Sequence, residues 1–259
     1  MLSYQHAFHA GNLADVQKHA LLAWVIDYLT RKDKPLSYIE THAGRGLYRL
    51  TDAAALKTGE AAQGIVKAEQ YFPQDHPYRQ RLEEARAMYG DDAYPGSPLF
   101  AALGLRETDK LHLAELHPQE NAALSDVMGS WGAHIRRDDG FDLALALTPP
   151  TPRRGLMLVD PSYEVKADYD YIPKVFAQIA RKWNVGILML WYPILRDGPH
   201  RQMLNILQEQ HPEALRHEVM FPPAREGHRM IGSGMFVVNP PYGLSDEMAE
   251  LDRRFAAFA

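Results

Sequence analysis

An acid, a proline and a tyrosine follow a run of apolar residues in the middle of the chain. The run is Gly155–Val159, and the group after it is Asp160-Pro161-Ser162-Tyr163. Four consecutive apolar residues after a glycine are typical of a buried parallel strand. Ligands of open α/β sheets bind at the carboxyl ends of the strands. The pattern therefore predicts that Asp160, Pro161 and Tyr163 meet a substrate.

These residue types suit an exocyclic amino group of a nucleobase. The lone pair of such a nitrogen is delocalised into the ring, so acceptors that hold its hydrogens would pull the nitrogen towards tetrahedral geometry. The Asp160 carboxylate and the Pro161 carbonyl are two acceptors on one rigid turn. Tyr163 could stack on a base that has been turned out of its helix. Asp160, Pro161 and Tyr163 are therefore the catalytic candidates.

A glycine-spaced loop and two acids predict a ligand that carries an adenosine. The strand expected at 36–40 runs into a loop whose first glycine is Gly44, a pattern that presents backbone N–H groups to a ligand. Glu115 ends the next core strand and is positioned for ribose hydroxyls. Asp139 and Gly140 follow the third strand and could bond an adenine edge. Each feature also fits a plain turn or an exposed acid, so both alternatives stay open.

Helices and strands alternate around these residues. Asn12 is expected to cap the first helix, with Asp15 at the N3 position. The alternation predicts a seven-stranded, mostly parallel Rossmann-like sheet with helices on both faces. Strand signals vanish from 51 to 94, which predicts a helical insertion subdomain between core segments 1–50 and 95–259. The expected strands are 36–40, 110–115, 134–136, 155–159, 185–191, 217–221 and 235–238.

Composition excludes several classes of protein. The 259 residues are 46% hydrophobic, enough for one large domain with a full core. The chain has no cysteine, which excludes a disulfide framework and a thiolate metal site. A formal net charge of -5 does not by itself suggest nucleic acid. The first residues lack the features of a signal peptide and no apolar run could span a bilayer, so a cytoplasmic protein is expected.

The sequence offers three alternatives to the site after Val159: a metal site, a serine hydrolase site and a second base-amino motif. A metal site could draw on histidines and acids, but their spacing along the chain argues against one, and no metal is expected. A serine hydrolase lacks its G-x-S-x-G turn, because Gly232-Ser233-Gly234 precedes a strand. Asn239-Pro240-Pro241-Tyr242 also fits a base-amino motif, but it follows the last strand rather than a central one. The candidate metal ligands are His6, His9, Asp15, His19, His42, Glu40 and Asp160.

Six stretches together resemble the RlmJ family of 23S ribosomal RNA adenine-N6 methyltransferases, in the class I S-adenosylmethionine-dependent superfamily. The nucleotide loop, the acid after the second strand and Asp-Pro-x-Tyr after the fourth carry the superfamily resemblance. The usual Asp-Pro-Pro-Tyr is Asp160-Pro161-Ser162-Tyr163 here, which should loosen the turn without removing its acceptors. The six stretches are Ser3–Asn12, Asp15–His19, Thr41–Gly44, Tyr94–Pro98, Glu115–Pro118 and Leu190–Pro193.

The resemblance implies a monomeric enzyme that methylates N6 of one adenine, position 2030, in 23S rRNA, by in-line transfer to a flipped-out base. It implies a helical insertion after the first strand and S-adenosyl-L-methionine as cofactor. Residues that would contact the cofactor are His19, His42, Gly44, Ser97, Glu115, Asp139, Gly140 and Asp160. Residues that would handle the substrate RNA are Tyr4, His6, Lys18 and Tyr163.

Two other functions are compatible with the sequence besides methylation of rRNA. One is a DNA adenine-N6 methyltransferase with the same site, and the other is a non-catalytic, cofactor-binding RNA module. If the protein binds RNA, as an rRNA methyltransferase or as a non-catalytic module, basic side chains are expected to contact the phosphates. Each of these side chains also fits ordinary solvated surface. These side chains are Arg136, Arg137, Arg153, Arg154, Lys166, Arg225 and Arg229.

Overall fold

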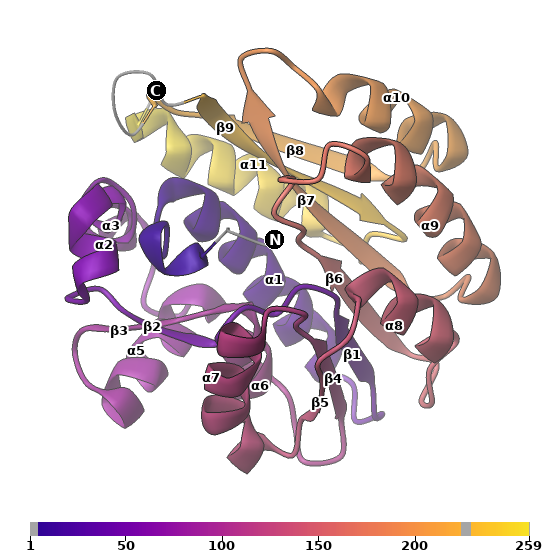
Figure 1. Ribbon diagram of the computed structural model, residues 1–259, viewed down its shortest axis with the longest axis horizontal. Coiled ribbons are helices and arrows are strands. Elements are labelled where there is room, and N and C mark those ends of the chain that lie inside the picture. The colour runs from indigo at the N-terminus through magenta and orange to yellow at the C-terminus, as the bar shows by residue number, and fades with distance from the viewer. Residues whose placement is uncertain (1–4, 224–228, 259) are drawn as a thin grey trace.

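A computed structural model describes residues 5–223 and 229–258 of the chain. Its centre is one seven-stranded sheet with the strand order β5-β4-β1-β6-β7-β9-β8 (Figure 1). Strand β9 pairs antiparallel with β7 and β8, and the other described strand pairs of this sheet are parallel, so the predicted mostly parallel sheet is confirmed. In chain order the strands are β1 Ser37–Glu40, β4 Lys110–Ala114, β5 His134–Arg136, β6 Gly155–Val159, β7 Ile187–Leu195, β8 Leu215–Met220 and β9 Met230–Val238.

Helices cover both faces of the sheet, as predicted. The sheet residues alternate between two apolar clusters, because successive side chains of a strand point to opposite faces. Leu156 and Leu158 of β6 belong to one cluster, and Met157 and Val159 to the other. One face carries α1 Leu13–Thr30, α5 Pro77–Tyr89, α6 Ser97–Gly104, α7 Pro118–Met128 and α11 Leu244–Phe255, and the other carries α8 Gly140–Leu147, α9 Asp168–Lys182 and α10 His200–Gln210.

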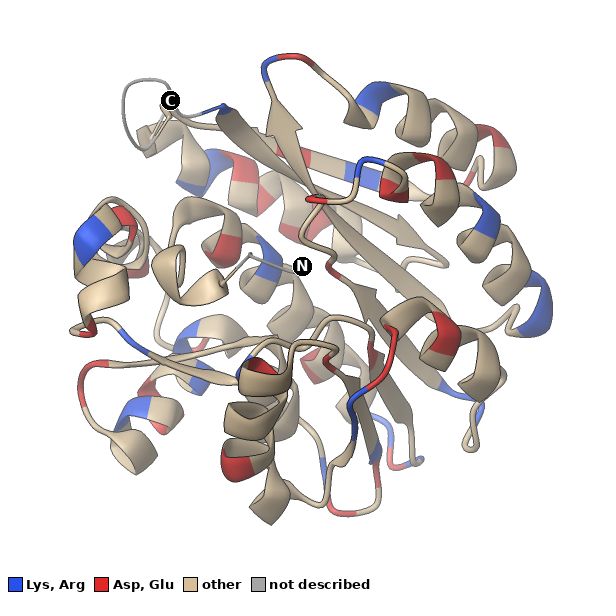
Figure 2. Ribbon diagram, viewed as in Figure 1, with Lys and Arg blue, Asp and Glu red and all other residues tan. Residues whose placement is uncertain are grey.

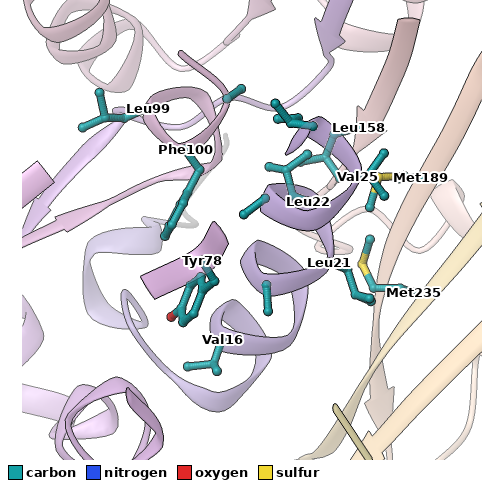
Figure 3. Packing of buried hydrophobic residues seen from close by; sticks show 14 of the residues in the cluster. Val16, Leu21, Leu22, Val25, Tyr78, Leu99, Phe100, Leu158, Met189 and Met235 are labelled. Carbon is teal, nitrogen blue, oxygen red and sulfur yellow. The ribbon is translucent and has the colours of Figure 1, made fainter. Parts of the chain in front are cut away.

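Helix α1 is buried around most of its circumference. Val16 and Leu22 are fully enclosed, and Figure 3 shows α1 side chains between the α5–α6 side and the sheet. The predicted cap is confirmed, since the Asn12 side chain accepts a hydrogen bond from the Asp15 N–H at 2.9 Å. This position sets the first turn of α1, with Asp15 and Lys18, beside the carboxyl edge of the sheet.

The carboxyl ends of β1, β4, β5 and β6 meet at one edge, because these four strands are parallel. Strand β1 lies between β4 and β6, so the chain leaves β1 towards one side and returns on the other. Loops beyond such a reversal form the usual crevice of doubly wound sheets. Glu115 follows β4, and Asp160 follows β6, at this edge.

Some strand boundaries were predicted wrongly. Strand β7 continues to Leu195, and β9 begins at Met230, because the two pair with each other along their whole length. A short β2, Leu47–Arg49, pairs with β3, Ala93–Pro95, in a second sheet that the sequence did not suggest. Tyr94 and Pro95, in the stretch Tyr94–Pro98 that resembles the RlmJ family, therefore lie in a strand.

The segment 51–94 is mostly helical, with a non-helical stretch at 72–76 and a non-helical end from 90 onwards. Helix α5 packs on α1 and α6, and Tyr78 and Leu82 belong to the same apolar cluster as α1. The boundaries of a separate insertion subdomain stay a prediction. Besides α5, the helices are α2 Ala53–Thr58, α3 Glu60–Gln63, α4 Ile65–Ala68 and the 3-10 turn Glu69–Tyr71. Among the helices of the described residues, none has the length and apolarity to cross a membrane.

Candidate active site

A cavity of about 940 Å³ opens at the carboxyl edge of the sheet. This volume lies in the range of pockets that enclose small organic ligands. Every described residue predicted for the site lines it, and Tyr4 lies outside the described residues. The residues brought together are His6, Lys18, His19, His42, Gly44, Ser97, Glu115, Asp139, Gly140, Asp160, Pro161 and Tyr163. Their roles stay predictions.

Lys18 joins two carboxylates at the centre of the cavity. Its Nζ lies 2.6 Å from Asp160 Oδ2 and 3.0 Å from Asp15 Oδ1. The Lys18 side chain is 4% exposed and the Asp160 side chain is 14% exposed. Burial alone would lower the pKa of Lys18, but Asp160 and Asp15 hold it above its usual value, so the ammonium stays charged at neutral pH. Lys18 therefore fixes the position of the Asp160 carboxylate.

Asp15 collects further donors from the segment before α1. Its Oδ2 accepts the Gly11 N–H at 2.9 Å and lies 2.8 Å from His6 Nε2. Burial would raise the pKa of Asp15, but the neighbouring His6, Lys18 and His19 hold it well below its usual value. An ionised Asp15 thus ties the segment at His6 to the first turn of α1.

Burial lowers the pKa of His19 well below its usual range, against the pull of Asp15. The ring is therefore neutral at pH 7. Its Nδ1 lies 3.0 Å from the Tyr94 hydroxyl, and the centroid of its ring lies 4.7 Å from that of the Phe100 ring. These contacts fix the orientation of His19 in the cavity wall.

The turn after β6 is held by Tyr163. This residue has a φ of 56°, a conformation that L residues rarely adopt. Its hydroxyl donates to the Trp191 carbonyl at 2.7 Å, and the centroid of its ring lies 4.8 Å from that of the Tyr169 ring. Tyr163 is 8% exposed but borders the cavity. Stacking of its ring on a base stays a prediction.

Trp191 is a site residue that the sequence reasoning did not select. It borders the same part of the cavity, its indole N–H donates to Ser233 Oγ at 2.8 Å, and Lys18 Nζ lies 5.6 Å from its ring centroid. The sequence did contain a signal for Trp191, because this residue ends the apolar strand expected at 185–191. Phe141, Asp168 and Tyr171 also line the cavity, but nothing in their local sequence marks them.

The other part of the cavity is organised by Glu115. Its Oε2 accepts the Gly44 N–H at 2.8 Å, and its Oε1 accepts the His117 N–H at 2.7 Å. Each carboxylate oxygen keeps a further lone pair for a ligand hydroxyl. Burial raises the pKa of Glu115 although both N–H groups favour the ionised form. The glycine loop and the acid after β4 thus form one unit.

Asp139 and Gly140 lie where α8 begins. Asp139 Oδ1 caps α8 by accepting the Phe141 and Asp142 N–H groups. A Cβ on Gly140 would lie 1.9 Å from the Thr41 carbonyl oxygen, so only glycine fits there. These residues have a structural role whatever else they bind.

His42 lines the cavity, and a buried acid, Glu40, contacts Ser97 of the cavity wall. Burial lowers the pKa of His42 to about 4, and its Nδ1 lies 2.7 Å from Thr41 Oγ1. Glu40 accepts hydrogen bonds from Ser97 Oγ and from the Tyr38 hydroxyl. Burial raises the pKa of Glu40 to about 8, although both bonds favour the ionised form. Ser97 therefore links the cavity wall to a buried acid.

The rejected motifs lie elsewhere or have other partners. The side chain of Asn239 donates to the carbonyl oxygens of Asn184 and Gly186, at the edge of the sheet opposite the cavity. Ser233 is fully buried inside β9. Within 5–223 and 229–258, no three His, Asp or Glu side chains are grouped as metal ligands would be.

The basic residues proposed for RNA divide between the two edges of the sheet. Arg153 and Arg154 precede β6, away from the cavity, and donate to carbonyl oxygens, including those of Lys182 and Lys34. Arg136 ends β5 at the cavity edge, and Arg229 lines the cavity beside its partner Asp197. Arg225 is outside the described residues. Acidic and basic residues are interspersed along the ribbon (Figure 2), so charge alone does not mark an RNA face.

Known proteins with similar sequences and structures were found. The family described as "Ribosomal RNA large subunit methyltransferase D, RlmJ" matches residues 33–256. The chain is 39% identical to the ribosomal RNA large subunit methyltransferase J of Escherichia coli strain K12 over 253 residues, 96% of this chain and 90% of the relative. A crystal structure from Legionella pneumophila str. Philadelphia 1 matches with a TM-score of 0.86 and 33% identity, covering 96% of this chain and 94% of that one. A SAM-dependent methyltransferase from Agrobacterium tumefaciens shares the fold, with a TM-score of 0.50 and 12% identity over 88% of this chain and 62% of that one.

Proposed function

The chain belongs to the RlmJ family of ribosomal RNA large subunit methyltransferases, and on this premise we propose that it methylates N6 of one adenine, position 2030, in 23S ribosomal RNA. The methyl donor is S-adenosylmethionine. The observation that carries the proposal is the joint position of Asp160 and Pro161 after β6, in the cavity that also holds Glu115. That arrangement sets acceptors for an amino group and for ribose hydroxyls in one enclosure.

The cavity suits S-adenosylmethionine by its size and by its chemistry. Glu115 has lone pairs left for ribose hydroxyls after accepting two backbone N–H groups. Leu116 and Phe141 supply apolar surface for an adenine ring. When bound, this cofactor would supply an electrophilic methyl group on a sulfonium centre.

The residues of the chain orient the amine and stabilise charge. Asp160 and the Pro161 carbonyl accept the two hydrogens of N6, which frees its lone pair for attack. Lys18 holds the Asp160 carboxylate in place, 2.6 Å away. Tyr163 stacks on the flipped-out base from the cavity wall. The attack transfers the positive charge from sulfur to N6, which becomes acidic and then gives up one proton to Asp160 or solvent, so Asp160 need not be a strong base. Catalysis then rests on positioning and electrostatic stabilisation.

Offering the purified protein tritiated S-adenosylmethionine with protein-free 23S rRNA or with duplex DNA tests the proposal. Label in rRNA, recovered as N6-methyladenosine after digestion, is the expected result. Label in DNA alone would identify a DNA adenine methyltransferase. Cofactor and RNA binding without label would identify a non-catalytic module.

A further inference from the structure

A buried acid from the helical segment 51–94 contacts the cap of α1. Glu60, the first residue of α3, is 6% exposed, and Asn12 is 9% exposed. The Asn12 Nδ2 group donates to Glu60 Oε2 at 3.0 Å. His9 Nδ1 lies 3.0 Å from Glu60 Oε1. Asn12 and His9 border the cavity, whereas Glu60 does not.

The contact fixes which way the Asn12 amide faces. With Nδ2 directed to Glu60, the opposite oxygen Oδ1 accepts the Asp15 N–H at 2.9 Å and caps α1. The capped turn carries Asp15 and Lys18, and Lys18 in turn touches Asp160. A continuous series of contacts therefore runs from Glu60 to the proposed catalytic carboxylate.

The backbone at the same place is closely fitted. The Ile65 N–H donates to the Gly11 carbonyl at 2.8 Å. A Cβ on Gly64 would lie 2.1 Å from that same carbonyl oxygen. Gly64 follows α3 directly, so the chain around Glu60 is fixed against the residues that precede α1.

We infer that Glu60 is a positioning residue for methyl transfer. It orients the Asn12 amide and so holds the first turn of α1, with Lys18, against Asp160. The inference rests on the proposed function and gives the helical segment 51–94 a part in it. It assigns Glu60 no contact with cofactor or RNA.

A compensating pair of substitutions tests this directly. Asn12→Asp keeps a good helix cap but sets a second carboxyl group against Glu60. Methyl transfer at saturating cofactor and rRNA is expected to fall by about tenfold or more, because a buried donor is replaced by an acceptor. Adding Glu60→Gln supplies an amide donor and should restore activity to within about threefold of wild type. Glu83→Gln, an exposed acid of α5 in the same segment, should not rescue Asn12→Asp.

Hydrogen exchange gives a readout that does not depend on the reaction. The amide hydrogens of residues 13–18 should exchange faster in Asn12→Asp and return to wild-type rates in the double variant. If Asn12→Asp does not fold, Glu60→Ala takes its place, with a similar loss of turnover and unchanged affinity for S-adenosylhomocysteine.

An absence of rescue, or rescue by Glu83→Gln, would overturn the inference. So would a folded Glu60→Ala variant with wild-type turnover. A wild-type protein that leaves rRNA unmethylated would refute the proposed function instead, and the exchange rates would still decide whether Glu60 holds the first turn of α1.

Discussion

The Lys18 ammonium lies 2.6 Å from the Asp160 carboxylate, although 142 residues separate the two in sequence. Lys18→Met would leave Asp160 and Asp15 facing each other without a cation. Removing one partner of a buried ion pair costs about 3 kcal/mol or more, so urea unfolding should show a loss of that size. Lys32→Met, at an exposed lysine just after α1, should change stability little. An equally stable Lys18→Met protein would show that the pair does not organise the site.

Glu115 is predicted to hold the cofactor. In the wild-type protein both carboxylate oxygens of Glu115 accept a backbone N–H. In Glu115→Gln an amide NH2 group replaces one of these oxygens, so two donors face each other. Binding of S-adenosylhomocysteine, measured by calorimetry, should weaken by about tenfold, while turnover at saturating cofactor changes less. Glu107→Gln, at an exposed acid, should bind like wild type. Unchanged affinity of Glu115→Gln would move the ribose site elsewhere.

The ring of Tyr163, rather than its hydroxyl, is predicted to serve the reaction. Tyr163→Phe removes the hydrogen bond to the Trp191 carbonyl and should cost about 1 kcal/mol of stability, with methyl transfer nearly retained. Tyr163→Ala removes the stacking surface and should slow single-turnover transfer by about tenfold or more. Equal losses of activity in the two variants would contradict a stacking role.

Glu40 should make stability depend on pH. Its pKa is about 8 in the folded protein and near 4.5 when exposed, so the folded state binds one more proton between these values. Stability from this group is therefore present at low pH and is lost as the pH rises from about 4.5 to about 8, by up to about 1.4 kcal/mol per pH unit. His42 acts in the opposite sense, since its pKa falls to about 4 and its contribution is lost on acidification below 6.5.

Glu40→Gln isolates the first effect. The free energy of unfolding of the variant, relative to wild type, should rise by at least about 2 kcal/mol between pH 5 and pH 8. Glu83→Gln should show no such trend. A difference that does not change with pH would mean that Glu40 is ionised in the folded protein.

The order of apolar strands and polar strand ends was enough to predict the sheet and the meeting of Asp160 with Glu115. Both acids follow parallel strands, and parallel strands end at one edge. The pairing of Lys18 with Asp160 and of Asn12 with Glu60 depends on tertiary packing between distant segments, which no local pattern records. The β2–β3 pair was missed because three-residue strands carry almost no periodicity.

In the proposed function, Asp160 directs methylation to N6 of one adenine in 23S rRNA. The most direct measurement is nucleoside mass spectrometry and site mapping of 23S rRNA from cells that lack this protein, complemented with wild type or Asp160→Ala. N6-methyladenosine at a single site should be absent without the protein, return with wild type and stay absent with Asp160→Ala, although that variant should still bind RNA. Restoration of the mark by Asp160→Ala, or a mark on another atom, would contradict it.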